Sequence, residues 1–324
     1  MALVIVIILA LAFDFINGFH DSANAIATVV STKSLSPRAA IIMAAVLNLA
    51  GALVSTGVAR AFARGVVRPD EITLDLLMGG LVGAIAWNLA TWYFGIPSSS
   101  SHALVGGLAG AALVGPGPAG INLPGFVKMV LSLFISPVIG FVAGLALMLW
   151  LLPMLERAAG KKGIFARLQL LSAAAVAFSH GSNDAQKAMG IIAAALYALG
   201  VTSRIQVPWW VVVAAALAMG AGTSTGGWRI IQTMGDKITR LTPADGFAAE
   251  TAAVAVIGTA TLLRLPVSTT HIVSSAIAAV GLRRGAGAVH WEVLKSIGWA
   301  MLLTLPASGA VGAAAGWVLG RLLR

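Results

Sequence analysis

The sequence predicts an all-α, polytopic membrane protein of two inverted-topology repeats, with broken helices or re-entrant segments and about 10–12 membrane segments. Of its 324 residues, 59% are hydrophobic and 10% are charged, and the mean hydropathy is +0.94. Ordinary soluble proteins are roughly 25% charged. At about 20 residues per span, ten crossings and their loops account for the whole sequence. The 324 residues of this sequence therefore leave no room for a separate soluble domain.

The first repeat, residues 1–155, consists of five apolar stretches separated by polar turns. The opening stretch, 1–32, is interrupted by a polar cluster from Asn17 to Asn24, and Gly18 within it predicts a broken or locally unwound helix. No Lys or Arg precedes Lys33, so we interpret this stretch as the first membrane helix rather than a cleaved signal peptide. We expect the second stretch at about 39–59, the third at 76–94, the fourth ending at about 114 and the fifth at 126–152.

The second repeat, residues 168–324, follows a basic linker at 156–167 that we expect on the cytoplasmic side. It has the same order of apolar stretches. We expect the first stretch at 168–199, the second from 209 onward, the third around Glu250, the fourth ending at 281 and the fifth at about 293–319.

Two polar clusters of the same pattern support the internal repeat. Asn17-Gly18-Phe19-His20-Asp21-Ser22-Ala23-Asn24-Ala25 aligns with His180-Gly181-Ser182-Asn183-Asp184-Ala185-Gln186-Lys187-Ala188. Asp21 lies 76 residues before Pro97, and Asp184 lies 82 before Pro266, where matching Pro-x-Ser motifs stand. An odd number of spans per half predicts opposite orientations of the two halves.

The net charge of +10 is spread over short loops, which favours a role in membrane topology over nucleic-acid binding. With the N-terminus outside, twelve Lys and Arg residues lie on the cytoplasmic side and eight outside. The positive-inside rule favours this orientation. Cysteine is absent, which excludes disulfides and thiol catalysis.

Two Ser/Thr motifs each end one apolar stretch and open another. Proline and hydroxyl residues in a first helical turn suit the start of a half-helix, whose positive end attracts anions. Two such ends from opposed repeats could hold a tetrahedral oxyanion, and the alternative is that the hydroxyls only cap helices or bond back to carbonyls. The predicted anion-binding residues are Ser99, Ser100, Ser101, Ser268, Thr269 and Thr270.

Asp21 and Asp184 lie in apolar surroundings, where a charge costs roughly 2.5–3.5 kcal/mol on insertion scales. Carboxylates suit a coupling cation, Na⁺ or H⁺, and Asn17, Asn24 and Asn183 supply neutral oxygens. Lys187 stands where the first repeat has Asn24. We interpret it as a tethered counter-ion to Asp184 or Glu250, and the alternative is that it snorkels to the surface.

His20 and His180 belong to the repeated clusters, where an imidazole suits proton transfer or plain hydrogen bonding. No Gly-x-Ser-x-Gly or His-Glu-x-x-His motif is present, and the polar groups come in pairs, so the sequence does not predict an enzyme. Buried carboxylates in broken, inverted repeats favour a secondary transporter with alternating access over a channel.

The motifs resemble those of the inorganic phosphate transporter (PiT) family, in particular its bacterial low-affinity branch. The runs at 18–25, 183–188 and 266–271 are similar to its signatures, and 97–102 and 227–235 fit as well. The resemblance implies a homodimeric phosphate symporter of the cell (inner) membrane. It implies phosphate between the Ser/Thr tips and Gln186, cations near the Asp pair, and Glu250 as a membrane glutamate of the family.

Sodium-coupled members of that family generally have Asn where this chain has Lys187, and Gly-Ala-Asn-Asp where it has Gly-Phe-His-Asp. We therefore expect H⁺ as the coupling ion, with Na⁺ at Asp21, Asn24 and Asp184 as the alternative. Phosphate could travel as a neutral divalent-metal complex, and no other cofactor is expected. Sulfate, which is also tetrahedral, is the rival substrate.

Overall fold

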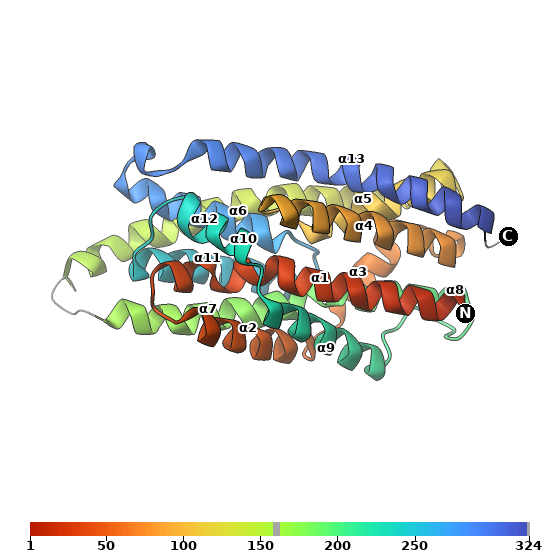
Figure 1. Cartoon of the computed structure of the whole chain (residues 1–324), viewed down its shortest axis with the longest axis horizontal. Coiled ribbons are helices and arrows are strands. Elements are labelled where there is room, and N and C mark those ends of the chain that lie inside the picture. The colour runs from red at the N-terminus through yellow and green to blue at the C-terminus, as the bar shows by residue number, and fades with distance from the viewer. Residues whose placement is uncertain (158–162, 323–324) are drawn as a thin grey trace.

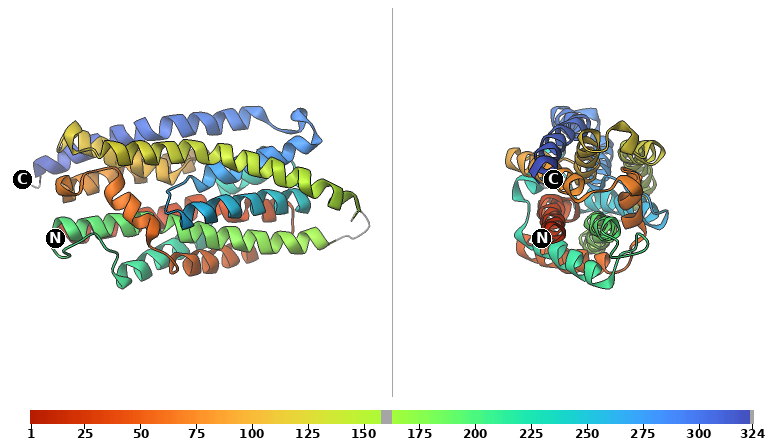
Figure 2. Two further views of the ribbon diagram at one scale, coloured as in Figure 1. Left: turned by 180° about the vertical axis from the view of Figure 1, so that it is seen from behind. Right: turned by 90° about the vertical axis from the view of Figure 1, so that its right-hand side faces the viewer.

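The structure is a computed structural model that describes residues 1–157 and 163–322. Its helices lie side by side in an elongated bundle (Figure 1). Helix α1 begins and α13 ends at the same end of this bundle, whereas α6 ends and α7 begins at the opposite end (Figures 1 and 2). Each half thus crosses the bundle an odd number of times, which agrees with the predicted inversion.

The first half comprises helices α1 to α6, and they follow the predicted apolar stretches closely. Their bounds are α1 Ala2–Ser31, α2 Pro37–Ala52, α3 Gly57–Gly65, α4 Leu74–Phe94, α5 Ser100–Val114 and α6 Leu123–Arg157. Ser36 and Thr73 cap α2 and α4 with their side chains, which satisfies free N–H groups at the helix starts. Helix α3 begins within the second expected span and continues into the stretch that we expected to be a loop, with a bend of 75° from α2.

The second half comprises α7 to α13 and repeats the order. Its helices are α7 Ile164–Asp184, α8 Gln186–Ala198, α9 Trp209–Thr225, α10 Trp228–Gln232, α11 Pro243–Leu262, α12 Thr269–Gly281 and α13 Trp291–Leu322. A π-turn, Thr233–Lys237, continues α10. Residues 158–162 of the predicted linker lie outside the described residues.

The expected break at Gly18 is wrong, because α1 is continuous through it. The glycine serves packing instead: a Cβ there would lie 2.4 Å from the Met219 carbonyl oxygen of α9. The helix break lies instead in the second polar cluster, where α7 ends at Asp184 and α8 starts at Gln186.

Over the described residues, α1, α4, α6 and α13 are each long and apolar enough to cross a membrane. The bent pairs α2–α3 and α9–α10 raise this number to six if each is one span. Helices α5 and α12 have 15 and 13 residues. At 1.5 Å per residue they are shorter than the roughly 30 Å hydrocarbon core, so neither can cross it alone.

The two halves pack around each other rather than side by side. Helix α1 lies against α9 while α7 lies against α2, and α13 covers α4 and α5 while α6 covers α11 and α12. The α4–α5 pair occupies the half of the bundle nearer the N-terminus, and the α11–α12 pair occupies the other half (Figures 1 and 2). The starts of α5 and α12 therefore meet in the middle of the bundle.

Candidate functional site

The meeting point of the two half-helices is a buried, polar centre. Ser101 at the start of α5 donates a hydrogen bond from its Oγ to the Val267 carbonyl oxygen at 3.0 Å, just before α12 begins. The rings of His102 and His271, each in the first turn of its helix, meet with their centroids 5.3 Å apart. The two Ser/Thr motifs, far apart in sequence, thus form one structure.

Two of the six predicted hydroxyl residues act as helix caps. Ser99 Oγ accepts from the His102 backbone N–H at 3.2 Å, and Ser268 Oγ accepts from that of His271 at 3.3 Å. This is the capping alternative stated above. Ser100, Thr269 and Thr270, in contrast, direct their hydroxyls to the buried carboxylates.

Asp21, on α1, holds one of these carboxylates. Its Oδ1 accepts from Thr270 Oγ1 at 3.2 Å and lies 2.7 Å from His20 Nδ1. Its Oδ2 accepts from Ser100 Oγ at 2.9 Å. The partners come from both half-helices, so Asp21 joins them.

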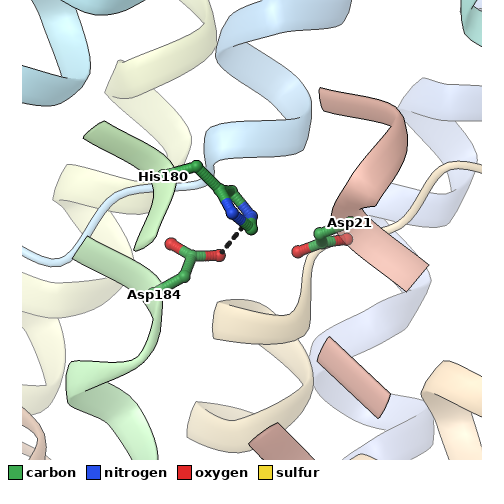
Figure 3. Close-up of side chains that lie close together, drawn as sticks. All are labelled: Asp21, His180 and Asp184. Carbon is green, nitrogen blue, oxygen red and sulfur yellow. Dashed lines mark ion pairs between the residues drawn. The ribbon is translucent and has the colours of Figure 1, made fainter. Parts of the chain in front are cut away.

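Asp184 is the corresponding carboxylate at the end of α7. Its Oδ2 accepts from Lys187 Nζ at 2.8 Å and from Thr269 Oγ1 at 3.2 Å, and lies 3.3 Å from His180 Nε2. Asp21, His180 and Asp184 face one another, with one ligand atom each within 4.8 Å of the others (Figure 3). The two repeated clusters therefore form a single centre.

Lys187 lies inside this centre, with its side chain fully buried. Its ammonium donates to Asp184 and, at 2.7 Å, to Ser100 Oγ. Because Ser100 in turn donates to Asp21, the lysine connects both carboxylates. The snorkelling alternative for Lys187 is excluded.

Asn24 completes the centre from α1. Its Nδ2 donates to Thr269 Oγ1 at 3.2 Å and to Thr270 Oγ1 at 3.1 Å. Its Oδ1 and the Oδ1 of Asp184 have no hydrogen-bond partner within the described part of the chain. Free carboxylate and amide oxygens are the ligands that hard cations prefer, so these residues fit a small cation as well as a proton.

Three predicted site residues lie apart from this centre. Asn183 donates its Nδ2 to Thr261 Oγ1 at 2.9 Å. The side-chain amide of Gln186 accepts from the Val58 and Ala59 N–H groups at the start of α3. Glu250 is fully buried and accepts from Thr28, Ser172 and Gln169. Their assignments to phosphate or cation binding stay predictions.

Several polar residues that the sequence reasoning did not assign support the two histidines. His20 Nε2 lies 3.2 Å from Thr91 Oγ1 and 3.4 Å from Ser98 Oγ. His180 Nδ1 lies 3.1 Å from Asn48 Oδ1, whose amide donates to Thr223 at 2.9 Å. In the sequence, each of these residues is a polar side chain within an apolar span. Such a residue indicates a buried hydrogen-bond partner, but the sequence does not identify that partner.

Comparison with known proteins gives a consistent result. A model described as the phosphate transporter family matches residues 17–312. A probable low-affinity inorganic phosphate transporter of Bacillus subtilis (strain 168) is 47% identical over 98% of this chain and 97% of that protein. One of the same description from Rhizobium meliloti (strain 1021) is 45% identical over 96% and 94%. A solved structure titled the sodium-dependent phosphate transporter has a TM-score of 0.88 and 27% identity, covering 99% of both chains.

Proposed function

The chain belongs to the phosphate transporter family, and we propose that it imports inorganic phosphate with protons by alternating access to the centre between its two halves. It is a multi-pass protein of the cell membrane and not an enzyme. The sulfate alternative has no support, since the family and these relatives are described by phosphate alone.

The observation that carries the proton proposal is the position of Lys187. Its ammonium occupies the space between the two carboxylate clusters, with oxygens of Asp184 and Ser100 at 2.8 and 2.7 Å. These distances are those of charge-assisted hydrogen bonds. A covalently tethered cation thus satisfies the charge that a bound metal ion would otherwise satisfy.

Charge balance then accounts for symport. Asp21 and Asp184 against Lys187 leave one negative charge in the centre when both histidines are neutral. Phosphate is itself an anion and would be repelled. It can enter this buried centre only with added positive charge, which protons on the carboxylates or a divalent metal bound to the phosphate would bring.

For the phosphate itself we propose the hydroxyls of Ser100, Thr269 and Thr270, with Lys187 as the cationic partner. These hydroxyls lie at two buried helix starts, where N–H groups and the helix dipole favour anions. In the described arrangement they donate to Asp21 and Asp184. Protonation of those acids would weaken these bonds and free the hydroxyls for phosphate.

Sodium is the second candidate for the coupling ion. It is favoured by the unpartnered Oδ1 atoms of Asn24 and Asp184, within the residues described, and by the likeness to a protein titled as sodium-dependent. We also propose that the protein is a homodimer and that its two repeats comprise residues 1–155 and 168–324.

The test is uptake of labelled phosphate into proteoliposomes, with proton and sodium gradients imposed separately. We expect accumulation under an inward proton gradient without sodium. Accumulation that requires sodium would refute proton coupling. Inhibition by excess sulfate to the same degree as by unlabelled phosphate would refute selectivity for phosphate.

A further inference from the structure

A further buried acid, Asp14, lies on α1 outside the centre described above. Its side chain is fully buried, and neither carboxylate oxygen has a hydrogen-bond partner among the described residues. An ionised carboxylate in such surroundings is strongly disfavoured, whereas the neutral acid is tolerated. Asp14 therefore needs a ligand of positive charge.

Two fully buried amides accompany this acid. Asn17 follows Asp14 by three residues on α1, so both side chains lie on the same face of the helix. Asn88 belongs to α4, which starts at the same end of the bundle as α1 (Figure 1). His20 of α1 contacts Thr91 of α4. Asn17 precedes His20 by three residues and Asn88 precedes Thr91 by three residues, so the two amides lie at the same level along the neighbouring helices.

Neither amide has a partner for its oxygen or its nitrogen within residues 1–157 and 163–322. Unpartnered buried polar groups are rare and call for a function. An amide can donate its N–H to a carboxylate and can accept from a carboxylic acid through its oxygen. Asn17 and Asn88 are thus suited to hold Asp14 in both protonation states.

Helix α9 packs closely against α1 beside Asp14. A Cβ on Gly222 of α9 would lie 1.9 Å from the carbonyl oxygen of Phe15, the residue that follows Asp14. Helix α9 contains no ionisable residue, and on α4 Asp75 and Tyr93 lie in the first and last turns. The charged groups that act on Asp14 are Lys187 of α8 and Asp184 of α7. A proton needs a single acceptor, which either carboxylate oxygen of Asp14 supplies.

Asp14 also belongs to a row of positions along α1 that carry or contact buried acids. Residues 14, 21 and 28 are seven apart, which places them on one face of the helix with about 10 Å between successive positions. Asp14 is the first, Asp21 is the second, and Thr28 donates to the buried Glu250. A buried carboxyl group therefore lies beside α1 on each side of Asp21, Asp14 on α1 itself and Glu250 on α11.

We propose that Asp14 is a proton-binding site of the transport cycle, held by Asn17 and Asn88, that loads the proton accompanying phosphate. Asp14 carries this proton as a carboxylic acid, and when it gives the proton up it remains as a carboxylate held by the two amides. This inference rests on the proposed proton–phosphate symport and names a coupling residue for it.

The test compares Asp14→Asn, which mimics the permanently protonated acid, with Asp14→Glu and with Asp70→Asn at an exposed acid. Each variant is reconstituted, and proton-driven net uptake is measured beside phosphate–phosphate exchange. We expect Asp14→Asn to lose net uptake at least tenfold while exchange stays within about twofold, Asp14→Glu to restore part of the uptake, and Asp70→Asn to match the wild type. Asp14→Asn that accumulates phosphate like the wild type would overturn the proposal.

The wild-type control separates this inference from the proposed function. Wild type without a response to the proton gradient refutes proton symport itself, before any variant is considered. A spectroscopic readout covers the case of a variant without activity. In infrared difference spectra between alkaline and acidic pH, the wild type should show a carboxylic-acid C=O band that Asp14→Asn lacks. An identical band in that variant would also overturn the proposal.

Discussion

Two lysine–carboxylate pairs of this chain share their spacing and contact distance and differ strongly in burial. Lys187 lies 2.8 Å from Asp184, and Lys295 lies 2.7 Å from Glu292, both with i,i+3 spacing. The first pair is fully buried, whereas the side chains of the second are 66% and 85% exposed. The two lysines therefore form a matched pair for mutation to Asn.

Removing one partner of a buried ion pair costs about 3–5 kcal/mol, because the other charge stays buried without compensation. Lys187→Asn should lose this much stability in a sodium-free buffer. Exposed pairs contribute less than about 1 kcal/mol, so Lys295→Asn should match the wild type.

Sodium should restore the stability of Lys187→Asn. The variant gains an amide oxygen near the Oδ1 atoms of Asn24 and Asp184, which have no hydrogen-bond partner among the described residues. This donor set suits a small cation. Binding at 100 times the Kd would return about 2.7 kcal/mol. The wild type should not respond, since its ammonium already occupies the position.

The assay is thermal unfolding of the purified proteins in detergent, followed by tryptophan fluorescence, in choline and in sodium chloride of equal ionic strength. A Lys187→Asn variant as stable as Lys295→Asn would refute the buried-pair argument. A destabilised variant that sodium and choline affect equally would refute the idea that Lys187 replaces a metal ion.

Two further predictions follow from packing and from the hydroxyl contacts. Gly222→Ala places a Cβ 1.9 Å from the Phe15 carbonyl oxygen. Overpacking of this kind costs about 1–3 kcal/mol, which thermal unfolding should show as a loss of stability. Gly298→Ala is the control, because its Cβ meets open space among the described residues and should leave stability unchanged. Ser100→Ala removes a hydroxyl between Asp21 and Lys187 and should raise the KM for phosphate about tenfold, near the 1.4 kcal/mol of one hydrogen bond. Ser274→Ala, whose hydroxyl bonds only to backbone carbonyls in the described structure, should leave KM unchanged, and equal KM values for both serine variants would contradict the assigned anion site.

The centre was largely predictable because polar residues in an apolar chain have few possible partners. Asp21, Asp184 and the hydroxyl motifs recur at matching spacings in both halves, and a buried carboxylate must find donors. Thr269, Thr270 and Ser100 satisfy that need. Membership of the family followed from the same motifs.

The direction of individual side chains was less predictable. Asn183 precedes Asp184 by one residue and so lies about 100° around the helix, where it faces Thr261 instead of the centre. Gln186 bonds to the start of α3, a helix end that exists only because the chain bends after α2. Gly18 indicated a break, but its role is the contact with α9, a long-range feature that the local sequence does not contain.

The hydrogen bonds of the centre tie the two halves together. Thr270 of the second half donates to Asp21 of the first, Asn24 of the first donates to both threonines, and Lys187 of the second donates to Ser100 of the first. Any movement of one half against the other must break these bonds. Their strength depends on charge, since bonds to ionised groups are roughly twice as strong as neutral ones. Protonation of the carboxylates would therefore lower the barrier to that movement at the moment when phosphate takes over the freed hydroxyls. On this account, coupling between the ion and the substrate needs no separate signal, because the same donors serve both.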